Sequence, residues 1–209
     1  MLPGGPSLEP TPKANAGEHV RAFVAVDAAE ELRAPIEALQ DRLRSAGADV
    51  KWVDSHQFHI TLKFLGDVAV GDVAAVVDAV KGAVASVPSF QMCLHGVGAF
   101  PSARQPRAVW IGATDGADAM AELAKAVDDA LSPLGFERER RPFRSHLTLG
   151  RVRSDRGIVS LARRLNEEQH TAIGTMRVQQ VVVMRSVLTP KGPIYTRLGL
   201  APLKETRNR

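Results

Sequence analysis

Two short segments of the chain repeat the same pattern of a histidine, an aliphatic residue and a threonine. The first copy holds His59 and Thr61, and the second holds His146 and Thr148. In both segments apolar residues alternate with polar ones, which is the pattern of a β-strand with one buried face. Because successive side chains of a strand point to opposite faces, each histidine shares a face with its threonine. Two copies in a chain with six histidines indicate two related half-sites.

Two imidazoles that face one site can act as a general acid and a general base. An unperturbed imidazole has a pKa of about 6.5, so one ring can be neutral while the other is protonated near neutral pH. This suits phosphodiester hydrolysis, in which one oxygen loses a proton and another gains one, with water as the nucleophile. The hydroxyls of Thr61 and Thr148 can donate hydrogen bonds to phosphate oxygens. Lys63, which strict alternation places on the face of His59, is expected to offset the developing negative charge.

A metal site is the competing use of these histidines. Two histidines and two threonines supply at most two good zinc ligands, whereas catalytic zinc usually has three protein ligands. The sequence has no His-Glu-x-x-His pattern, and Cys93 is its one cysteine. It also lacks the glycine patterns of P-loops and dinucleotide-binding folds. We therefore expect neither a metal nor an organic cofactor. Histidines that only satisfy hydrogen bonds in the core are the plainer alternative, which the repetition disfavours.

Basic residues outnumber acidic ones, with 27 Lys and Arg against 23 Asp and Glu and a formal net charge of +4. This balance favours polyanionic partners. Six arginines, Arg144 and Arg151 among them, surround His146 between residues 137 and 153. Strict alternation turns Arg151 away from His146, whereas a bulge at Gly150 would bring it to the same face. The sequence leaves both orientations of Arg151 open.

These segments must be positioned by a domain that mixes helices and antiparallel strands. Asp27 is the expected N-cap of the first helix, Pro35 is expected to weaken that helix, and two prolines predict a loop over residues 98–106. Each half of the chain repeats helices and strands around one motif, which favours a single bilobal α+β domain. Periodicity predicts strands at residues 20–26, 50–53, 57–65, 90–97, 108–113, 144–152, 176–188 and 194–200, and helices at 28–46, 70–87, 115–134 and 157–168.

The ends of the chain differ in composition from the rest. Residues 1–18 hold four prolines and no apolar run, which predicts a flexible extension rather than a signal peptide. We expect one bilobal domain over residues 19–203 and a polar tail over residues 204–209. No apolar stretch approaches the roughly 18–20 residues that span a bilayer, and a single cysteine allows no internal disulfide. A cytoplasmic monomer that does not bind membranes is expected.

Taken together, these residues resemble the 2H phosphoesterase superfamily. The closer likeness is to the bacterial and archaeal RNA 2′,3′-cyclic phosphodiesterases, also called 2′-5′ RNA ligases. The resemblance implies two pseudo-symmetric lobes, each an antiparallel sheet with outer helices, around a central groove. The segments that carry it are residues 21–26, 58–66, 96–101, 142–151, 185–190 and 192–195.

The resemblance also implies a reaction and roles for individual residues. Water would open a terminal 2′,3′-cyclic phosphate on RNA to leave a 2′-phosphate, with His59 as the proton donor and His146 as the proton acceptor. Thr61, Thr148 and Arg151 would bind the phosphate. The expected partner is RNA with a 2′,3′-cyclic phosphate terminus, such as a tRNA fragment, and reverse 2′-5′ ligation would be a side activity.

Further candidates for substrate binding are the side chains near the motifs. Lys63 and Arg144 carry positive charge, and Phe23 could stack on a terminal base, although Phe23 fits a core position better. Two other functions stay open. One is an RNA-end-binding module with vestigial catalysis, and the other is a 2H phosphodiesterase acting on a small cyclic phosphate such as ADP-ribose 1″,2″-cyclic phosphate.

Overall fold

The computed structural model describes residues 17–190 and 192–205. The predicted extension over residues 1–18 and the predicted tail over residues 204–209 therefore lie mostly outside the described residues. In the described part, each half of the chain supplies both strands and helices, as the α+β prediction requires. None of the described helices combines the length and the apolar character that crossing a bilayer requires.

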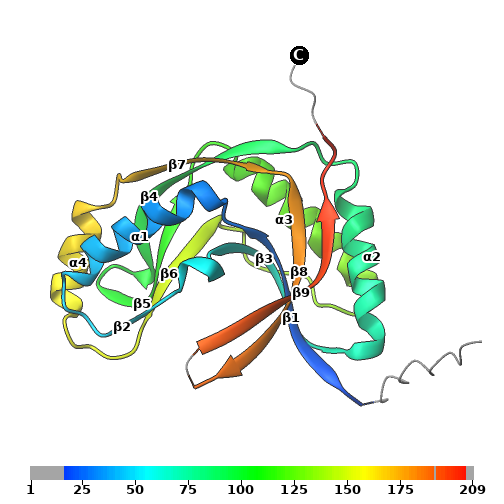
Figure 1. Ribbon diagram of the computed structural model, residues 1–209, viewed down its shortest axis with the longest axis horizontal. Helices are drawn as coiled ribbons and strands as arrows, with labels where there is room; N and C mark the ends of the chain where they lie inside the picture. The colour runs from blue at the N-terminus through cyan, green and yellow to red at the C-terminus, as the bar shows by residue number, and fades with distance from the viewer. Residues whose placement is uncertain (1–16, 191, 206–209) are drawn as a thin grey trace, which may run out of the picture.

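Nine strands and four helices make up the described fold (Figure 1). The strands are β1 (His19–Asp27), β2 (Val50–Trp52), β3 (His59–Ala69), β4 (Phe90–Ser102), β5 (Gln105–Ala113), β6 (His146–Val152), β7 (Ala172–Val178), β8 (Gln180–Thr189) and β9 (Gly192–Pro202). The helices are α1 (Glu30–Arg44), α2 (Val73–Val84), α3 (Ala117–Leu131) and α4 (Ile158–Glu167), with short 3-10 turns η1 (Ser55–Gln57), η2 (Val70–Asp72) and η3 (Ser132–Leu134).

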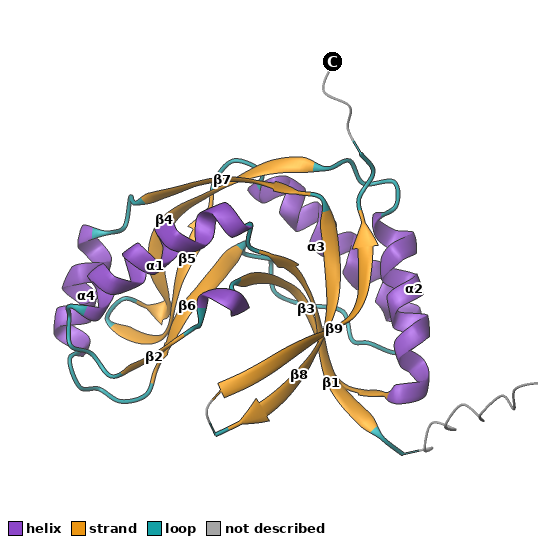
Figure 2. Ribbon diagram, in the orientation of Figure 1, coloured by secondary structure: helices purple, strands orange, loops and turns teal. Residues whose placement is uncertain are grey.

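The strands form one curled antiparallel sheet with the order β7-β4-β5-β6-β3-β1-β8-β9, and β2 pairs with β6. Figure 2 shows α1 and α4 at one end of this sheet and α2 and α3 at the other, on its outer side. The first half of the sheet holds β2 and β4–β7, and the second holds β1, β3, β8 and β9. The prediction of two lobes with antiparallel sheets and outer helices is confirmed.

The two halves of the sheet meet where β3 lies beside β6. This antiparallel contact has one registered pair, Ile60 opposite Leu147. Both side chains are buried, at 1% and 0% exposure, and each is the middle residue of a His-x-Thr motif. The seam of the fold therefore lies at the place where the two motifs come together.

Helix α1 forms because its apolar residues recur on one side of the helix. Leu32, Ile36, Leu39 and Leu43 are all buried beneath it, and full burial of such a side chain stabilises the fold by about 1.5–3 kcal/mol. The predicted N-cap is wrong, because the helix begins at Glu30 with Ala29 as its N-cap residue and without a side-chain cap. Asp27 instead ends β1 and forms an ion pair with Arg197 of β9.

Three predicted strand boundaries are wrong. The first motif strand continues to Ala69, and residues 98–106, predicted as a loop, belong largely to β4 and β5. The run predicted as one strand over residues 176–188 divides at Gln179 into the end of β7 and most of β8. The division arises because β7 pairs with β4 in one half of the sheet and β8 pairs with β1 in the other.

Candidate active site

The two motifs lie side by side at the seam, and the register fixes how their side chains are arranged. With Ile60 opposite Leu147, antiparallel geometry places His59 across from Thr148 and Thr61 across from His146. The two histidines then occupy one diagonal of a four-residue rectangle and the two threonines occupy the other. Diagonal neighbours in such sheets are about 7–8 Å apart. This leaves room for a phosphate between an acid on one side and a base on the other.

Each imidazole is oriented by the same local hydrogen bond. Nδ1 of His59 donates to the backbone carbonyl of Gln57 at 2.7 Å, and Nδ1 of His146 donates to the carbonyl of Arg144 at 2.6 Å. A carbonyl oxygen can only accept, so Nδ1 carries the proton in both rings. The nitrogen that remains to exchange a proton with a ligand is therefore Nε2 in both half-sites.

Aromatic rings hold each imidazole in place. Phe23 and Tyr195 lie 4.9 Å and 5.3 Å from the ring of His59 between centroids. Phe100 and Trp110 lie 5.0 Å and 6.4 Å from the ring of His146. Phe23 is only 4% exposed, so it supports His59 more than it offers a surface for stacking a base.

Burial changes the acid–base behaviour of His59. Desolvation lowers the pKa of its imidazole, while the hydrogen bond to the Gln57 carbonyl and the negative charge of Asp27 act to raise it. The nearby His146 and Arg151 lower it further. The pKa of His59 is therefore below its ordinary value in the ligand-free protein.

A β-bulge on β6 places Arg151 at the site. Against β5, Thr148 lies opposite Trp110, but Gly150 lies opposite Val109 and Arg151 opposite Ala108. One extra residue, Leu149, is thus inserted after the motif, which returns Arg151 to the face of Thr148. The sequence left two orientations of Arg151 open. In the structure its side chain shares a face with Thr148 and lines the cleft that contains both motifs.

The side chain of Gln40 from α1 supports this bulge. It is 1% exposed, and its amide donates to the carbonyls of Leu149 and Val53 at 2.8 Å and 2.9 Å. Sequence reasoning missed Gln40, although a polar residue on the buried side of a helix was a usable signal. It singled out Phe23 for stacking on a base or for the core, but it missed the contacts that Tyr195, Phe100 and Trp110 make with the histidines, because these depend on distant strands.

A matching bulge on β3 has the opposite result for Lys63. Against β1, Thr61 lies opposite Ala25, while Lys63 lies opposite Val24. Val24 belongs to the core under the helices, whereas Ala25 packs on the other side of the sheet. The prediction that Lys63 shares the face of His59 is therefore wrong.

The ammonium of Lys63 is engaged away from the motif histidines. Lys63 is 8% exposed, forms an ion pair with Asp128 of α3 and donates to the carbonyl of Glu137 at 2.6 Å. Although Lys63 borders the cleft, its charge is neutralised by a structural partner. We conclude that Lys63 joins β3 to α3.

After this bulge, Phe64 occupies the position in β3 that Arg151 occupies in β6. It lies opposite Phe23, with the two rings 6.3 Å apart, and it is 68% exposed. The two half-sites are therefore alike in their histidine and threonine but different beyond them. One offers a guanidinium to the cleft and the other offers an open aromatic ring.

The polar groups that face the cleft are available to a ligand. Within the described residues, the hydroxyls of Thr61 and Thr148 have no hydrogen-bond partner, and Arg151 has no carboxylate partner. A hydroxyl can donate to a phosphate oxygen, and a guanidinium can do so with two hydrogen bonds. The arrangement can therefore bind a phosphate group between the two imidazoles.

The cleft around the motifs is large and positively charged. Its volume is ≈ 2280 Å³, beyond the roughly 300–1,000 Å³ of common small-molecule pockets. Ten lysine and arginine side chains of the described residues line it, against three acidic ones. Arg144 is among them, so its side chain lines the cleft while its carbonyl orients His146. Such a surface attracts an extended polyanion.

Comparison with known proteins accounts for the two half-sites. The family described as LigT like Phosphoesterase matches the chain twice, over residues 26–110 and 111–195, so that each match contains one motif. The chain belongs to the LigT-like phosphoesterase family. The RNA 2′,3′-cyclic phosphodiesterase of Methanothermobacter thermautotrophicus is 40% identical over 85% of this chain and 95% of its own. The protein of the same name from Archaeoglobus fulgidus is 36% identical over 84% of this chain and 96% of its own.

Solved structures of other proteins share the fold. The crystal structure of TT0787 from Thermus thermophilus superposes with a TM-score of 0.75 at 27% identity, covering 90% of this chain and 100% of that one. E. coli LigT superposes with a TM-score of 0.70 at 23% identity, covering 90% and 99% of the two chains. Two LigT repeats around one curled sheet are thus the architecture of this phosphoesterase.

A metal site would need ligands in addition to the two motif histidines. Among residues 17–190 and 192–205, no three His, Cys, Asp or Glu side chains gather closely enough to hold an ion. Most of the cationic side chains that line the cleft are arginines, which bind phosphate oxygens directly. The chemistry that this chain's own side chains offer is proton transfer and hydrogen bonding.

Proposed function

We propose that this phosphoesterase hydrolyses the 2′,3′-cyclic phosphate at the end of an RNA chain, with His59 as general acid and His146 as general base. The observation that carries the proposal is the arrangement of His59, Thr61, His146 and Thr148 as a rectangle, here called the motif rectangle. In it, two imidazoles with free Nε2 atoms lie diagonally across from each other. The relatives named RNA 2′,3′-cyclic phosphodiesterases match most of the chain, which supports this substrate class.

Each histidine moves one proton in the proposed reaction. Nε2 of His146 takes a proton from water as the water oxygen forms a bond to phosphorus. The bond from phosphorus to the 3′ oxygen breaks, and His59 gives its Nε2 proton to that oxygen. The product carries a 2′-phosphate and a free 3′-hydroxyl. The diagonal placement fits this, because the attacking and leaving oxygens lie roughly in line on opposite sides of phosphorus.

The negative charge of the transition state requires hydrogen-bond donors that are already in place. Thr61 and Thr148 supply hydroxyls on the other diagonal of the rectangle, and Arg151 supplies a guanidinium from the end of the bulge. Lys63 has no such role because Asp128 holds its ammonium. The same groups would serve a 2′-5′ ligation, in which a 5′-hydroxyl replaces water as the nucleophile, the bond from phosphorus to the 3′ oxygen breaks and a 2′-5′ linkage forms.

An RNA end fits the cleft better than a small cyclic phosphate. The cleft of ≈ 2280 Å³ extends well beyond the two motifs, and four of its arginines lie within residues 138–144, in addition to Arg151. A mononucleotide cannot reach all of these charges, whereas several nucleotides of a single strand can. The exposed ring of Phe64 adds a flat surface on which a base near the cyclic phosphate can stack.

The test is product analysis with competing substrates. The purified protein, with EDTA present, is incubated with an RNA oligonucleotide ending in a 2′,3′-cyclic phosphate and, separately, with ADP-ribose 1″,2″-cyclic phosphate. We expect the oligonucleotide to give a 2′-phosphate, identified by chromatography against 2′- and 3′-phosphate standards, with the higher kcat/KM. A 3′-phosphate product, or a preference for the small compound, would contradict the proposal. RNA binding without any product would favour an end-binding module.

A further inference from the structure

The two motif histidines face different residues on the strands that flank the seam. His59 of β3 lies opposite Asp27 of β1, whereas His146 of β6 lies opposite Gly112 of β5. The two halves are otherwise closely matched at these positions, with the same orienting hydrogen bond in each ring. A carboxylate beside one histidine and no side chain beside the other is therefore a chemical difference between the two half-sites.

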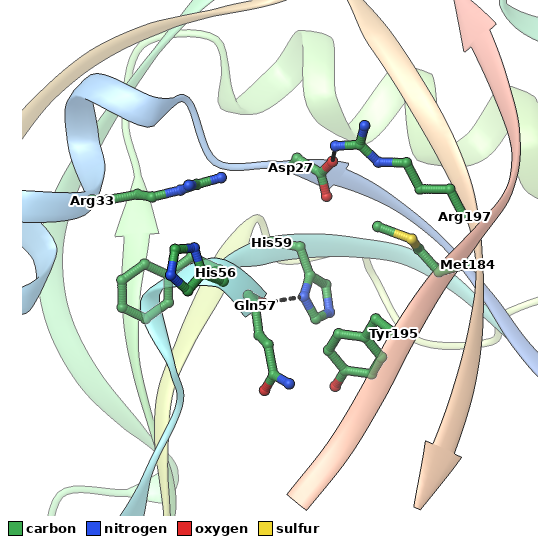
Figure 3. A pocket seen from close by; sticks show the side chains of 9 residues that line it. Asp27, Arg33, His56, Gln57, His59, Met184, Tyr195 and Arg197 are labelled. Carbon is green, nitrogen blue, oxygen red and sulfur yellow. Dashed lines mark hydrogen bonds and ion pairs between the residues drawn. The ribbon is translucent and has the colours of Figure 1, made fainter.

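Asp27 is fixed in place beside His59. Residues directly opposite each other in an antiparallel pair have Cβ atoms about 4.5–5.5 Å apart and side chains on the same face. The Asp27 side chain is 25% exposed, and Arg197 of β9 donates to its carboxylate at 2.8 Å. Figure 3 shows the Asp27–Arg197 pair on one side of His59 and Tyr195 on the other. Asp27, His59 and Arg197 all border one small cavity of ≈ 140 Å³.

Asp27 is the single carboxylate among the described residues that line this cavity. Among the charged neighbours of His59, Asp27 has the largest effect on the pKa of the imidazole, which it raises. Burial opposes this effect and is the largest influence of all. The negative end of the Asp27–Arg197 pair therefore faces the imidazole. Among the residues that the structure describes, the other titratable or charged groups around His59 are Arg197 and Tyr195 of β9, Arg33 of α1, His56 of η1, and His146 and Arg151 of β6.

We propose that Asp27, held by Arg197, is a positioning residue that assigns the proton-donor role to His59. This inference rests on the proposed function, because a donor role has meaning only for that reaction. A fixed carboxylate favours the imidazolium of its neighbour. Gly112 supplies no side chain in the matching place beside His146. The carboxylate therefore supports His59 alone, where it offsets part of the effect of burial on the imidazolium.

The same asymmetry resets the site after each turnover. The reaction leaves His59 neutral and His146 protonated. To begin again, His146 must release its proton to solvent and His59 must take one up. The Asp27 carboxylate favours the second step, and Gly112 supplies no side chain in the matching place beside His146. Asp27, at the end of β1, thus sets the direction in which protons pass between His59 and His146.

The experiment compares Asp27→Asn with Arg197→Gln. Both substitutions break the same ion pair, but they change the charge beside His59 in opposite directions. Asp27→Asn removes the carboxylate, and Arg197→Gln leaves it without its neutralising partner. Asp78→Asn is the matched control, because it removes a carboxylate from the Asp78–Lys81 pair on α2. That pair does not line the cleft.

Two readouts are followed, the titration of the His59 imidazole by NMR in the full-length protein and the pH dependence of kcat/KM. We expect Asp27→Asn to lower the His59 midpoint by about half a pH unit and Arg197→Gln to raise it by a similar amount. At pH values above the His59 midpoints of the wild type and both variants, kcat/KM is proportional to the protonated fraction of His59. It should therefore fall about threefold in Asp27→Asn and rise about threefold in Arg197→Gln, while Asp78→Asn matches the wild type.

The inference is overturned if both variants move the His59 midpoint in the same direction, as loss of a purely structural pair would, or if neither moves it. The NMR titration needs no substrate. If the wild-type protein turned over no cyclic phosphate, the proposed function would fail, and the opposed shifts would still decide whether Asp27 controls the protonation of His59.

Discussion

His59 and His146 are restrained by their own strands before any ligand arrives. Each ring donates from Nδ1 to a carbonyl two residues earlier in the chain, at 2.7 Å and 2.6 Å, so the tautomer and the ring orientation are set by a contact within one segment. An exchangeable ring nitrogen held toward the cleft does not have to be ordered during the reaction. At the residue scale, therefore, the site is already arranged for proton transfer.

The lowered pKa of His59 predicts how the rate depends on pH. As the proton donor, His59 must be protonated, and burial lowers its pKa in the ligand-free protein. The alkaline fall of kcat/KM, which reports the free enzyme, should then begin below the ordinary histidine pKa of about 6.5. A bound phosphate anion favours the imidazolium, so the alkaline fall of kcat should lie at higher pH. Rate profiles from pH 5 to 9 check this, and a kcat/KM that is flat over that range would contradict it.

Arg151 should contribute through the geometry of its guanidinium as well as its charge. Arg151→Gln is expected to lower kcat/KM by about 10²-fold, since it removes a donor aimed at developing negative charge. Arg151→Lys should restore only part of this loss, because an ammonium cannot make two parallel hydrogen bonds. Steady-state kinetics on a cyclic-phosphate-ended oligonucleotide measure both. Equal kcat/KM values for Arg151→Gln and the wild type would show that Arg151 does not contribute to the reaction.

At the scale of elements, two bulges decide which side chains complete the half-sites. Each motif strand gains one extra residue after its threonine, so that the next residues change faces. On β6 this change brings Arg151 to the cleft. On β3 it turns Lys63 toward Asp128 of α3 and turns Phe64 outward. The same local irregularity in both repeats thus yields a phosphate-binding side and an aromatic side.

The support that Gln40 gives to the β6 bulge can be tested directly. Gln40→Ala removes a donor from the buried carbonyl of Leu149 and from the part-buried carbonyl of Val53. We expect the free energy of unfolding to fall by about 1–3 kcal/mol. The loosened bulge should also raise KM through Arg151. Glu37→Ala, an exposed position on the same helix, is the control. Urea unfolding and steady-state kinetics give the two measurements, and equal stability for the two variants would mean that the bulge does not depend on Gln40.

Sequence periodicity predicted the elements that carry the motifs, but not the irregularities within them. Alternation was sufficient to predict that His59 and Thr61 share a face, and likewise His146 and Thr148, because the apolar residue between each pair must enter the core. It placed Lys63 on the wrong face and could not decide whether a bulge brings Arg151 back to the face of His146. A bulge depends on the register of a neighbouring strand and on a distant partner such as Gln40. The division of β7 from β8 at Gln179 was missed for a similar reason. Two apolar strands joined end to end look like one until their partners are known.

At the scale of the whole molecule, neither repeat contains a complete site. One motif lies in each repeat, and the seam between β3 and β6 joins them inside a cleft lined from both halves of the sheet. The cleft continues past the motifs along residues 138–144, where four of its arginines lie. The architecture therefore places a compact chemical centre within a long, positively charged surface.

This surface predicts that long substrates bind with a strong dependence on salt. Arg140→Gln/Arg141→Gln should raise KM for a cyclic-phosphate-ended oligonucleotide and reduce the slope of log KM against log salt by about 0.7 per lost phosphate contact. KM for a 2′,3′-cyclic mononucleotide should not change. Arg138→Gln is the control, because Arg138 is already paired with Asp129 and should have a smaller effect. The prediction fails if the salt slopes of the double variant and the wild type coincide.

The most direct test of the account is a kinetic cycle on the two motif histidines. The kcat/KM for hydrolysis of a 2′,3′-cyclic-phosphate-ended oligonucleotide is measured for the wild type, His59→Ala, His146→Ala and the double variant. We expect each single substitution to lower kcat/KM by at least about 10²-fold. The double variant should lose much less than the product of the two single effects, because an acid and a base that act in one step fail together. Full activity in either single variant, or losses that simply multiply, would contradict a two-histidine mechanism at the seam.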